Sequence, residues 1–286
     1  MTVFEIFKTK AKNKTANIGI GLGDNEEHNI KILNASIEFL KEYDATIFIF
    51  GNENVIERIK NHKISDTETK KINFINSKEP EQEILNFLKN NMIDAIVRGC
   101  ISSSKFLNNL KNSLGISEIN RLALLETYDG YQFFYGPVGI DECNDVQNKI
   151  AFVKKAIKQL KYLEIEPKIS VLSGGRIGDV GRDSQVDKSI NFAEELIEYF
   201  KNLYPNLNIN HDEILIENSI KNKSNVIIAP DGISGNLIYR TLVHLGGGKA
   251  YGAIYMDIEP IVIDTSRVGN ISEIFGALIL ALALVH

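Results

Sequence analysis

The chain has 286 residues, of which 44% are hydrophobic and 24% are charged. This length is typical of about two domains, and the composition excludes a disordered chain, a collagen-like chain and a disulfide scaffold. Lys and Arg total 32 against 37 Asp and Glu, which gives a net charge of −5. A nucleic-acid-binding protein usually has a basic excess or patch, and this sequence shows neither, so we expect no nucleic-acid partner.

The cysteines and the chain ends give further expectations. Cys100 and Cys143 lack the spacing of a zinc or redox motif, so we expect two reduced thiols in a cytoplasmic protein. Residues 1–5 lack the basic start and apolar run of a signal peptide. The longest apolar stretch, 274–285, is about a dozen residues, whereas a membrane-spanning helix needs about 20. We expect this stretch to form a core helix and no part of the chain to span a membrane.

Strand-like and helix-like segments alternate along the chain, which is the pattern of an α/β fold. In the first half, buried apolar runs predict the strands and an apolar face at helical spacing predicts the helices. The expected strands are 17–21, 45–50, 71–75 and 95–98, and the expected helices are 27–43, 55–60, 80–90 and 104–114. The charged stretch 61–71 is typical of a solvated surface segment.

The second half continues the same alternation. The expected strands are 121–127, 132–135, 168–173, 225–228, 251–255 and 261–264, and the expected helices are 146–160, 185–203, 235–244 and the apolar C-terminal stretch. No low-complexity linker separates the two halves, so we expect the domains to share the chain through crossovers.

A glycine turn, Gly19-Ile20-Gly21-Leu22-Gly23-Asp24, follows the first expected strand. Such a turn can let a cofactor approach the backbone at a helix N-terminus. It resembles the G-x-G-x-G turn of S-adenosylmethionine-dependent methyltransferases, whereas Asp24 breaks the dinucleotide-binding pattern. The alternative is a tight strand-to-helix turn without a ligand.

A second glycine-rich loop, 173–183, follows the strand at 168–173. Its backbone N–H groups and its two arginines could hold a phosphate. Asp179 and Asp183 could instead pair with the arginines and form a rigid, salt-bridged loop. The loop residues that we expect to bind a ligand are Ser173, Gly174, Gly175, Arg176, Gly178, Asp179 and Arg182.

Two further motifs carry polar side chains at strand ends. Ser266 and Arg267 could form an anion clamp, and Glu273, about two helical turns later, could act as a general base if it faces the same site. The same residue types are also common helix caps and first-turn residues. Asp231 and Asn236 lie in a turn that leads into a helix, where they could line a ligand site or cap the helix.

The histidines do not form a recognisable site. None of the five has ligand spacing with another histidine, a cysteine or a carboxylate cluster, so we expect structural or surface roles and no metal site. They are His28, His62, His211, His244 and His286. Histidine-based acid/base chemistry is therefore poorly supported.

Four segments occur in the order found in the phosphate acetyl/butyryltransferase superfamily. Residues 166–173 resemble the family's strand into its ligand loop, and Val186-Asp187-Lys188 resembles its V-D-K helix start. Residues 228–239 resemble the P-D-x-x-x-G-N-I-x-Y segment, and residues 260–267 resemble the P-V-x-D-L-S-R strand end. The resemblance covers residues 140–286 and, more loosely, the first half.

This resemblance implies an α/β fold of two α/β/α domains with an interdomain cleft, of the phosphotransacetylase-like (isocitrate/isopropylmalate dehydrogenase-like) class. It implies a discontinuous domain one, residues 1–121 and 257–286, and a domain two, residues 122–256, through which the family forms homodimers. In the family a Ser–Arg pair binds the acyl phosphate and a following Asp acts on the coenzyme A thiol. The matching positions here are Ser266, Arg267 and Glu273.

The chain departs from that family at three places. The loop 173–179 replaces the family's S-x-S-T-K-G-S loop, and Val268 replaces the Gly after Ser–Arg. Asn108 or Asn109 stands where the family has a phosphate-binding arginine. Asparagine has neither the charge nor the forked donors of arginine.

The S-G-G-R-x-G-D-x-G-R-D loop and the short chain are similar to the methanogen-specific branch called MtxX, or methanogenesis marker protein 4, which is catalogued as methyltransferase-associated. This resemblance implies a methyltransferase or a methyltransferase accessory subunit, with other methanogenesis enzyme components as partners. A phosphate acyltransferase and a non-catalytic ligand-binding or regulatory subunit are the alternatives. The expected ligand is a phosphate-bearing or coenzyme A-like molecule.

Overall fold

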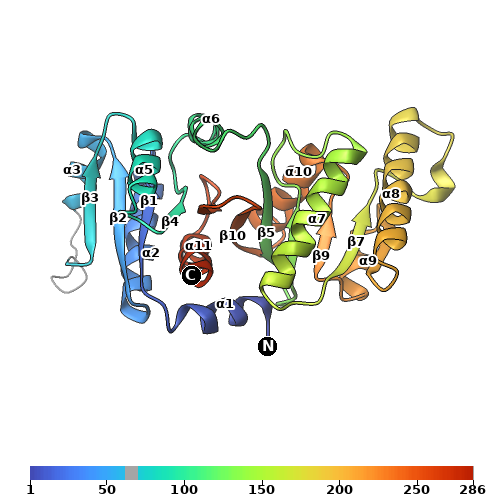
Figure 1. Ribbon diagram of the computed structural model, residues 1–286, viewed down its shortest axis with the longest axis horizontal. Helices are drawn as coiled ribbons and strands as arrows, with labels where there is room; N and C mark the ends of the chain where they lie inside the picture. Colours follow the sequence, from blue (N-terminus) through green and yellow to red (C-terminus); the bar gives the residue numbers. More distant parts are fainter. Residues whose placement is uncertain (62–69, 286) are drawn as a thin grey trace. The chain divides into compact units, whose positions relative to one another are not determined.

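The computed structural model describes residues 1–61 and 70–285. The chain forms two compact units: unit 1 is Met1–Ile119 with Ala250–His286, and unit 2 is Asn120–Lys249 (Figure 1). Most of the stretch that we expected to be a solvated surface segment, residues 62–69, lies outside the described residues.

Unit 1 contains the N-terminal and the C-terminal segments of the chain. Its strands, in sheet order, are β3 (Ile72–Asn76), β2 (Ala45–Gly51), β1 (Ala16–Gly21), β4 (Ala95–Val97), β11 (Ile261–Asp264) and β10 (Lys249–Met256). The first five are parallel, and β10 is antiparallel to β11. The C-terminal segment thus joins unit 1 by pairing β11 with β4.

Helices cover both faces of this sheet. One face carries α1 (Val3–Ala11), α2 (Glu26–Glu42) and α11 (Ile271–Leu284), with α3 (Glu53–Lys60) beside α2. The other face carries α5 (Pro80–Lys89) and α6 (Ser103–Leu114), which contact each other. The residues of α11 from Gly276 to Leu284 are all buried, which confirms the expected core helix. Within the described residues, no helix is long and apolar enough to cross a membrane.

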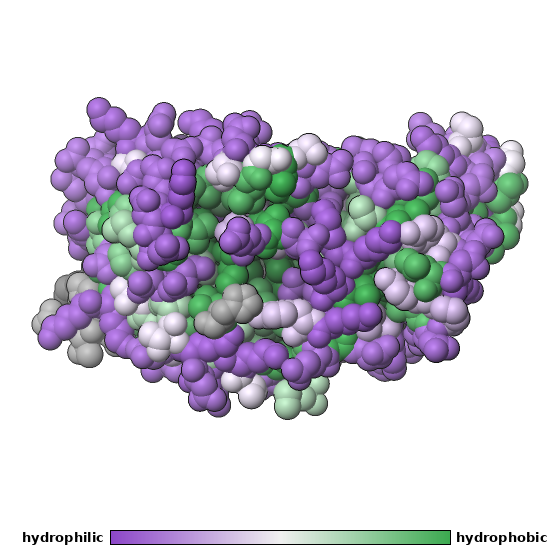
Figure 2. Space-filling view, viewed as in Figure 1, coloured by the Kyte–Doolittle hydropathy of each residue, from purple (hydrophilic) through white to green (hydrophobic). Residues whose placement is uncertain are grey.

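Unit 2 has its own strands and helices. Its strands, in sheet order, are β5 (Asn120–Glu126), β6 (Gln132–Gly136), β9 (Val226–Ile228), β7 (Lys168–Leu172) and β8 (Asn208–Glu213). Only β5 is antiparallel to its neighbour among the described pairs of this unit. The helices are α7 (Val146–Tyr162), α8 (Ser184–Leu203), α9 (Ile216–Lys221) and α10 (Gly232–His244), with a 3-10 turn η1 (Ile177–Asp179) before α8. The outward side of α7 is mainly hydrophilic, as expected for an amphipathic helix (Figure 2).

Several helices begin with an N-cap directly after a strand loop. Asn25, Asp145, Asp183 and Asp231 cap α2, α7, α8 and α10, and each side chain accepts a hydrogen bond from a backbone N–H of the first turn. Because these caps follow the carboxyl ends of parallel strands, the helix starts of each unit lie at one edge of its sheet. The three elements α1, β8 and α9 were missing from our sequence-based expectations.

Candidate functional site

The order of the strands in unit 1 marks one edge of its sheet. The chain proceeds from β1 outward to β2 and β3, and then returns to β4 on the other side of β1. The loops after β1 and β4 therefore leave the sheet where the strand order reverses, which is the position where open α/β sheets bind their ligands. Because β11 is parallel to β4, the loop with Ser266 and Arg267 leaves the sheet at this same edge.

The glycine turn after β1 packs directly against the loop after β4. A Cβ atom on Gly23 would lie 2.3 Å from the Cys100 carbonyl oxygen, and one on Gly21 would lie 2.5 Å from the Ile101 side chain. The Asn29 side chain closes the turn by donating to Gly23 O at 2.7 Å and accepting from Gly23 N–H at 3.1 Å. The close packing of the turn against the loop after β4 leaves no room for a Cβ atom at Gly21 or Gly23. Packing within unit 1 thus explains these glycines, which favours a tight turn over a cofactor-binding turn.

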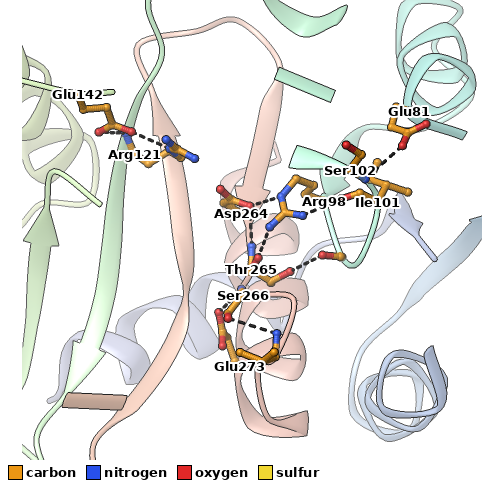
Figure 3. Close-up of polar contacts among 12 residues, drawn as sticks. Glu81, Arg98, Ile101, Ser102, Arg121, Glu142, Asp264, Thr265, Ser266 and Glu273 are labelled. Atoms are coloured by element: carbon orange, nitrogen blue, oxygen red, sulfur yellow. Dashed lines mark hydrogen bonds and ion pairs between the residues drawn. The ribbon is translucent and has the colours of Figure 1, made fainter. Parts of the chain in front are cut away.

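Arg98 joins the ends of β4 and β11. Its guanidinium donates to the Asp264 carboxylate, to the Thr265 carbonyl oxygen and, at 2.9 Å, to the Ile101 carbonyl oxygen (Figure 3). The Arg98 residue is only 4% exposed. Our sequence analysis did not identify Arg98 as a site residue. The sequence feature that could have identified it is the position of a charged residue at the end of an apolar strand.

Glu273 holds the loop that carries Ser266 and Arg267. Its Oε1 atom accepts a hydrogen bond from the Ser266 backbone N–H at 2.7 Å, and Glu273 is 3% exposed (Figure 3). The Ser266 hydroxyl accepts a hydrogen bond from the Val268 N–H at 3.3 Å. The fold thus brings together the three residues that we expected to be catalytic, and it uses one Glu273 oxygen to position the loop.

Arg267 and the start of α6 supply positive charge at this edge. Arg267 is exposed, and no carboxylate in the described part of the chain pairs with it. Burial raises the pKa of the Cys100 thiol after β4, while the charges of Arg98 and Arg267 oppose that shift. Helix α6 begins without an acidic residue in its first turn and without a side-chain cap from Ser102. The Glu81 carboxylate accepts a hydrogen bond from the Ser102 backbone N–H at 3.1 Å, so only the N–H groups that follow in the first turn could bind an anion (Figure 3).

The expected phosphate-binding arginine of the wider family has no counterpart on α6. Asn108 is exposed and Asn109 is half-buried on this helix. Their amides can donate hydrogen bonds, but they add no charge. Arg98 is buried at this edge, so Arg267 is its exposed arginine.

The glycine-rich loop of unit 2 borders a cavity of about 440 Å³, whose lining includes Gly174, Gly175, Arg176, Asp179, Arg182 and Asp183. Asp179 pairs with Arg182 and accepts from the Arg176 backbone N–H at 2.9 Å, and these contacts lower the pKa of its carboxyl group, with the Arg176 N–H as the largest cause. Asp183 instead caps α8. The Arg176 guanidinium forms no ion pair with any described residue, so it is the cation that this cavity can offer to a ligand.

Gly178 and Ser173, which we also expected to bind a ligand, are not among the residues that line this cavity. A Cβ atom on Gly178 would meet nothing within 4 Å, so packing does not require a glycine there. Ser173 is 1% exposed and lies beside His211 rather than in the cavity lining.

Ser173, His211 and Glu194 form a hydrogen-bonded chain in unit 2. Ser173 Oγ lies 2.8 Å from His211 Nε2, and Glu194 Oε1 lies 2.5 Å from His211 Nδ1. The Ser173 hydroxyl also lies 2.8 Å from the Gly175 carbonyl oxygen. Because Ser173 is buried, this chain positions the glycine-rich loop against β8 and α8. Our sequence analysis missed it because β8, which carries His211, was not predicted.

Asp231 and Asn236 hold α10 against the loop after β6. Asp231 Oδ1 accepts from the Ser234 N–H at 2.8 Å, and Asn236 Nδ2 donates to the Val138 carbonyl oxygen at 2.9 Å. A Cβ atom on Gly232 would lie only 1.8 Å from the Gly139 carbonyl oxygen. Contacts within unit 2 therefore explain Asp231 and Asn236 as residues that cap and position α10.

This close approach leads to the first prediction. Gly232→Ala is expected to lower the free energy of unfolding by about 3 kcal/mol, because the new methyl group overlaps a backbone atom that cannot move alone. Gly178→Ala is the matched control and is expected to change that free energy by less than about 0.5 kcal/mol. Urea unfolding of both variants measures the difference, and equal stabilities would contradict this packing account.

The described residues contain no group of three His, Cys, Asp or Glu side chains that could hold a metal ion. At this edge of unit 1, the Arg267 guanidinium, hydroxyls and backbone N–H groups are donors suited to an anion. The edge also carries carboxylates: Asp24 is exposed in the loop after β1, and Glu81 and Glu273 accept hydrogen bonds from backbone N–H groups. This edge of unit 1, formed by the loops after β1, β4 and β11, is hereafter called the switch-point site.

Comparison with known proteins places the chain in a family. The sequence model of the family described as phosphate acetyl/butaryl transferase matches residues 83–282. A protein of Methanosarcina mazei named "Putative methyltransferase mtx subunit X" is 37% identical over 284 residues, which is 99% of this chain and 95% of that protein. The protein of the same name from Methanosarcina acetivorans is 38% identical over 282 residues, 99% of this chain and 95% of that protein. This chain belongs to the mtx subunit X branch of the phosphate acetyl/butaryl transferase family.

Solved structures agree with this assignment at the level of the fold. A phosphotransacetylase from Streptococcus pyogenes superposes with a TM-score of 0.70 at 18% identity, covering 99% of this chain and 98% of that chain. A branched-chain phosphotransacylase from Enterococcus faecalis gives 0.68 at 17% identity, covering 94% and 99%. The expected phosphotransacetylase-like α/β fold and the expected resemblance to the mtx subunit X branch are both confirmed.

Proposed function

We propose that this member of the mtx subunit X branch is a component of a methyl-transfer system and that it binds a phosphate-bearing ligand at the switch-point site. Relatives that share more than a third of its residues carry the name of a methyltransferase subunit. The geometry supports the ligand-binding part of the proposal, and the relatives' name supports the methyl-transfer part.

The observation that carries the proposal is the exposed Arg267 guanidinium, which lies in the loop after β11, at the same edge of the sheet as the loop from β4 to α6. A guanidinium offers a planar fork of donors that matches a phosphate. The start of α6 adds a partial positive charge and the N–H groups that follow Ser102, whose own N–H donates to Glu81. The buried Arg98 and Glu273 hold the loop that carries Arg267. Because this loop is already ordered, ligand binding costs less conformational entropy.

The test is a titration of the purified chain with coenzyme A, acetyl phosphate and inorganic pyrophosphate. Arg267→Ala is expected to weaken the binding of these probes by about 10- to 100-fold, the effect of removing a charge-assisted hydrogen bond. The free energy of unfolding should stay the same, because the Arg267 side chain is exposed. Isothermal titration calorimetry measures the affinities.

Arg240→Ala is the matched control, because Arg240 is another exposed arginine and lies on α10 of unit 2. It should bind every probe as tightly as the wild type. Equal affinities for the wild type and Arg267→Ala, or no binding of any probe, would sink the proposed anion site.

Phosphate acyl transfer is the second candidate, favoured by the family match over residues 83–282. The replacement of an arginine by Asn108 or Asn109 argues against it, because the acyl phosphate would lose a charged donor. An assay for acetyl phosphate formed from acetyl-coenzyme A and phosphate separates the two candidates. Turnover that is lost in Ser266→Ala would establish the acyltransferase.

The proposal also includes a cytoplasmic homodimer that associates with other methanogenesis enzyme components. The homodimer rests on the family resemblance, and the association rests on the word subunit in the relatives' name. Analytical ultracentrifugation of the purified chain measures the first, and co-purification of the chain with methyltransferase components measures the second. A chain that co-purifies with such components and is inactive alone would be a non-catalytic subunit.

A further inference from the structure

A groove lies at the amino edge of the sheet in unit 1, opposite the switch-point site. Its volume is about 650 Å³, within the range of about 300–1,000 Å³ that is typical of small-molecule sites. It is lined by residues at the starts of β4 and β11 and by the C-terminal parts of α5 and α6. The switch-point site lies at the carboxyl ends of the same two strands, and the loops that form it do not line the groove.

The buried part of the groove lining is apolar. Leu85, Ile93 and Leu110 are buried, and Leu88 and Leu114 are half-buried. An apolar part of a ligand that packs on these side chains is removed from water, which stabilises the bound state. The groove therefore suits a ligand with an apolar body.

Two carboxylates lie at the rim of the groove, on the starts of adjacent strands. Asp94 directly precedes β4, Glu259 precedes β11, and the register of these parallel strands pairs Ile261 with Ala95. Both acidic residues are exposed, and neither forms an ion pair with a described residue. One Asp94 oxygen accepts from the Asn17 backbone N–H at 2.8 Å. Glu259 forms no hydrogen bond within the described part of the chain.

The other charges around the groove leave negative charge in excess. Lys89 is the basic side chain of the lining, against the two carboxylates. The helices α5 and α6 end in the lining, at Lys89 and Leu114, and the C-terminal end of a helix carries a partial negative charge. Lys14 lies beside the lining residue Val285, where its ammonium donates to the carbonyl oxygens of Ala283 and Val285. An occupant that complements this groove therefore carries positive charge.

We propose that this groove binds a small organic cation, an amine with an apolar body. The ammonium group lies against Asp94 and Glu259, and the apolar body lies between α5 and α6. An ammonium has three donors, so it can bind two carboxylates at once. The inference goes beyond the proposed phosphate site and does not rest on it, because the two sites lie at opposite edges of the sheet.

Titration of the full chain with hexylamine, followed by ¹H–¹⁵N NMR, tests the proposal. Hexanol and hexanoate are the matched probes, since they have the same chain length with no charge or the opposite charge. Hexylamine is expected to bind about tenfold more tightly than hexanol, the effect of one charge-assisted hydrogen bond, and hexanoate should bind more weakly than hexanol. Butylamine should bind about fivefold more weakly than hexylamine, because it buries fewer CH₂ groups in the groove. The largest shifts should occur at the backbone amides of Leu88, Leu114 and Ile261.

Three variants locate the binding site of the ammonium group. Glu259→Gln should weaken hexylamine binding by about three- to tenfold and leave hexanol binding unchanged. Its stability should match that of the wild type, because Glu259 is exposed. Asp94→Asn keeps an acceptor for the Asn17 N–H and should weaken hexylamine binding in the same way. Glu53→Gln is the matched control, an exposed glutamate of α3 on the other face of the sheet, and should leave the affinity unchanged.

Four results would overturn the inference. They are equal affinities for hexylamine and hexanol, no binding of hexylamine, wild-type hexylamine affinity in Glu259→Gln, and NMR shifts that lie away from the groove. Analytical ultracentrifugation with and without hexylamine tests the remaining occupant. If hexylamine dissociates a dimer of the chain, a second copy occupies the groove and the inference is wrong.

Discussion

Arg98→Ala is expected to lower the free energy of unfolding by about 3–5 kcal/mol, the usual effect of removing one partner of a buried ion pair. The substitution leaves the Asp264 carboxylate, whose side chain is 12% exposed, without its guanidinium partner. It also removes the hydrogen bonds that Arg98 donates to the carbonyl oxygens of Ile101 and Thr265. The ends of β4 and β11 would then be joined mainly by their strand pairing. Urea unfolding monitored by circular dichroism measures the change.

An exposed pair of unit 1 is the control for this prediction. Arg58 lies 3.8 Å from Glu26, and both side chains are more than half exposed, so Arg58→Ala should change the free energy of unfolding by less than about 1 kcal/mol. The double substitution Arg98→Met with Asp264→Leu should be more stable than Arg98→Ala, because no unpaired buried charge remains. An Arg98→Ala variant within about 1 kcal/mol of the wild type would contradict the role of Arg98 in joining these strands.

The second large effect concerns the pH dependence of stability in unit 2. Glu142 is 4% exposed, and its Oε1 atom accepts a hydrogen bond from Arg121 Nε at 2.7 Å (Figure 3). Burial raises the pKa of Glu142 to about 7, although the Arg121 charge opposes that shift. In the unfolded chain the pKa of a glutamate is about 4.3. The folded state therefore binds more protons than the unfolded state between about pH 4.5 and 7.

Because the folded state binds more protons, the stability that Glu142 contributes falls as the pH rises. The contribution of Glu142 to stability is full below about pH 4.5 and decreases as the pH rises to about 7. Glu142→Gln resembles the protonated carboxyl and lacks this dependence. The stability of the wild type relative to Glu142→Gln should therefore fall by about 2–3 kcal/mol over that range. Urea unfolding of both proteins at intervals from pH 4.5 to 8 measures it.

Glu195→Gln, an exposed position on α8, is the control for the loss of one carboxylate. A wild-type advantage over Glu142→Gln that stays constant, or grows, as the pH rises would refute the prediction. It would mean that the Arg121 guanidinium keeps Glu142 ionised and that the attraction between the two charges exceeds the desolvation of the carboxylate.

Much of the fold follows from local patterns in the sequence. The run at 45–50 predicts a strand because it is apolar and is followed by Gly51, and the apolar face of 27–43 predicts α2. The apolar stretch near the C-terminus predicts a core helix, and α11 is buried along most of its length. Each of these elements buries many apolar side chains of its own, so the local sequence pattern is enough to predict it.

The elements that were not predicted depend on distant partners. β8 has the sequence NINHDE, in which only Ile209 and Asp212 are buried, and its pairing with β7 supplies its hydrogen bonds. Helix α1 buries a narrow stripe of Phe4, Phe7 and Ala11, and Phe4 stacks on Tyr251 with ring centroids 4.0 Å apart. A partner so far along the chain leaves no periodic signal near the element itself.

By itself, the sequence determined the residue types of the candidate site, since the order of its motifs identified Ser266, Arg267 and Glu273 and the branch of the family. Only the tertiary structure decided what those residues contact. Arg98 and Asp264 are 166 positions apart in the sequence and meet because β11 pairs with β4. The structure likewise decided that Asp231 and Asn236 hold a helix and that the His28 ring is buried without a partner. Local periodicity specifies which residues enter strands and helices, whereas the order of strands in the sheet decides which loop ends meet.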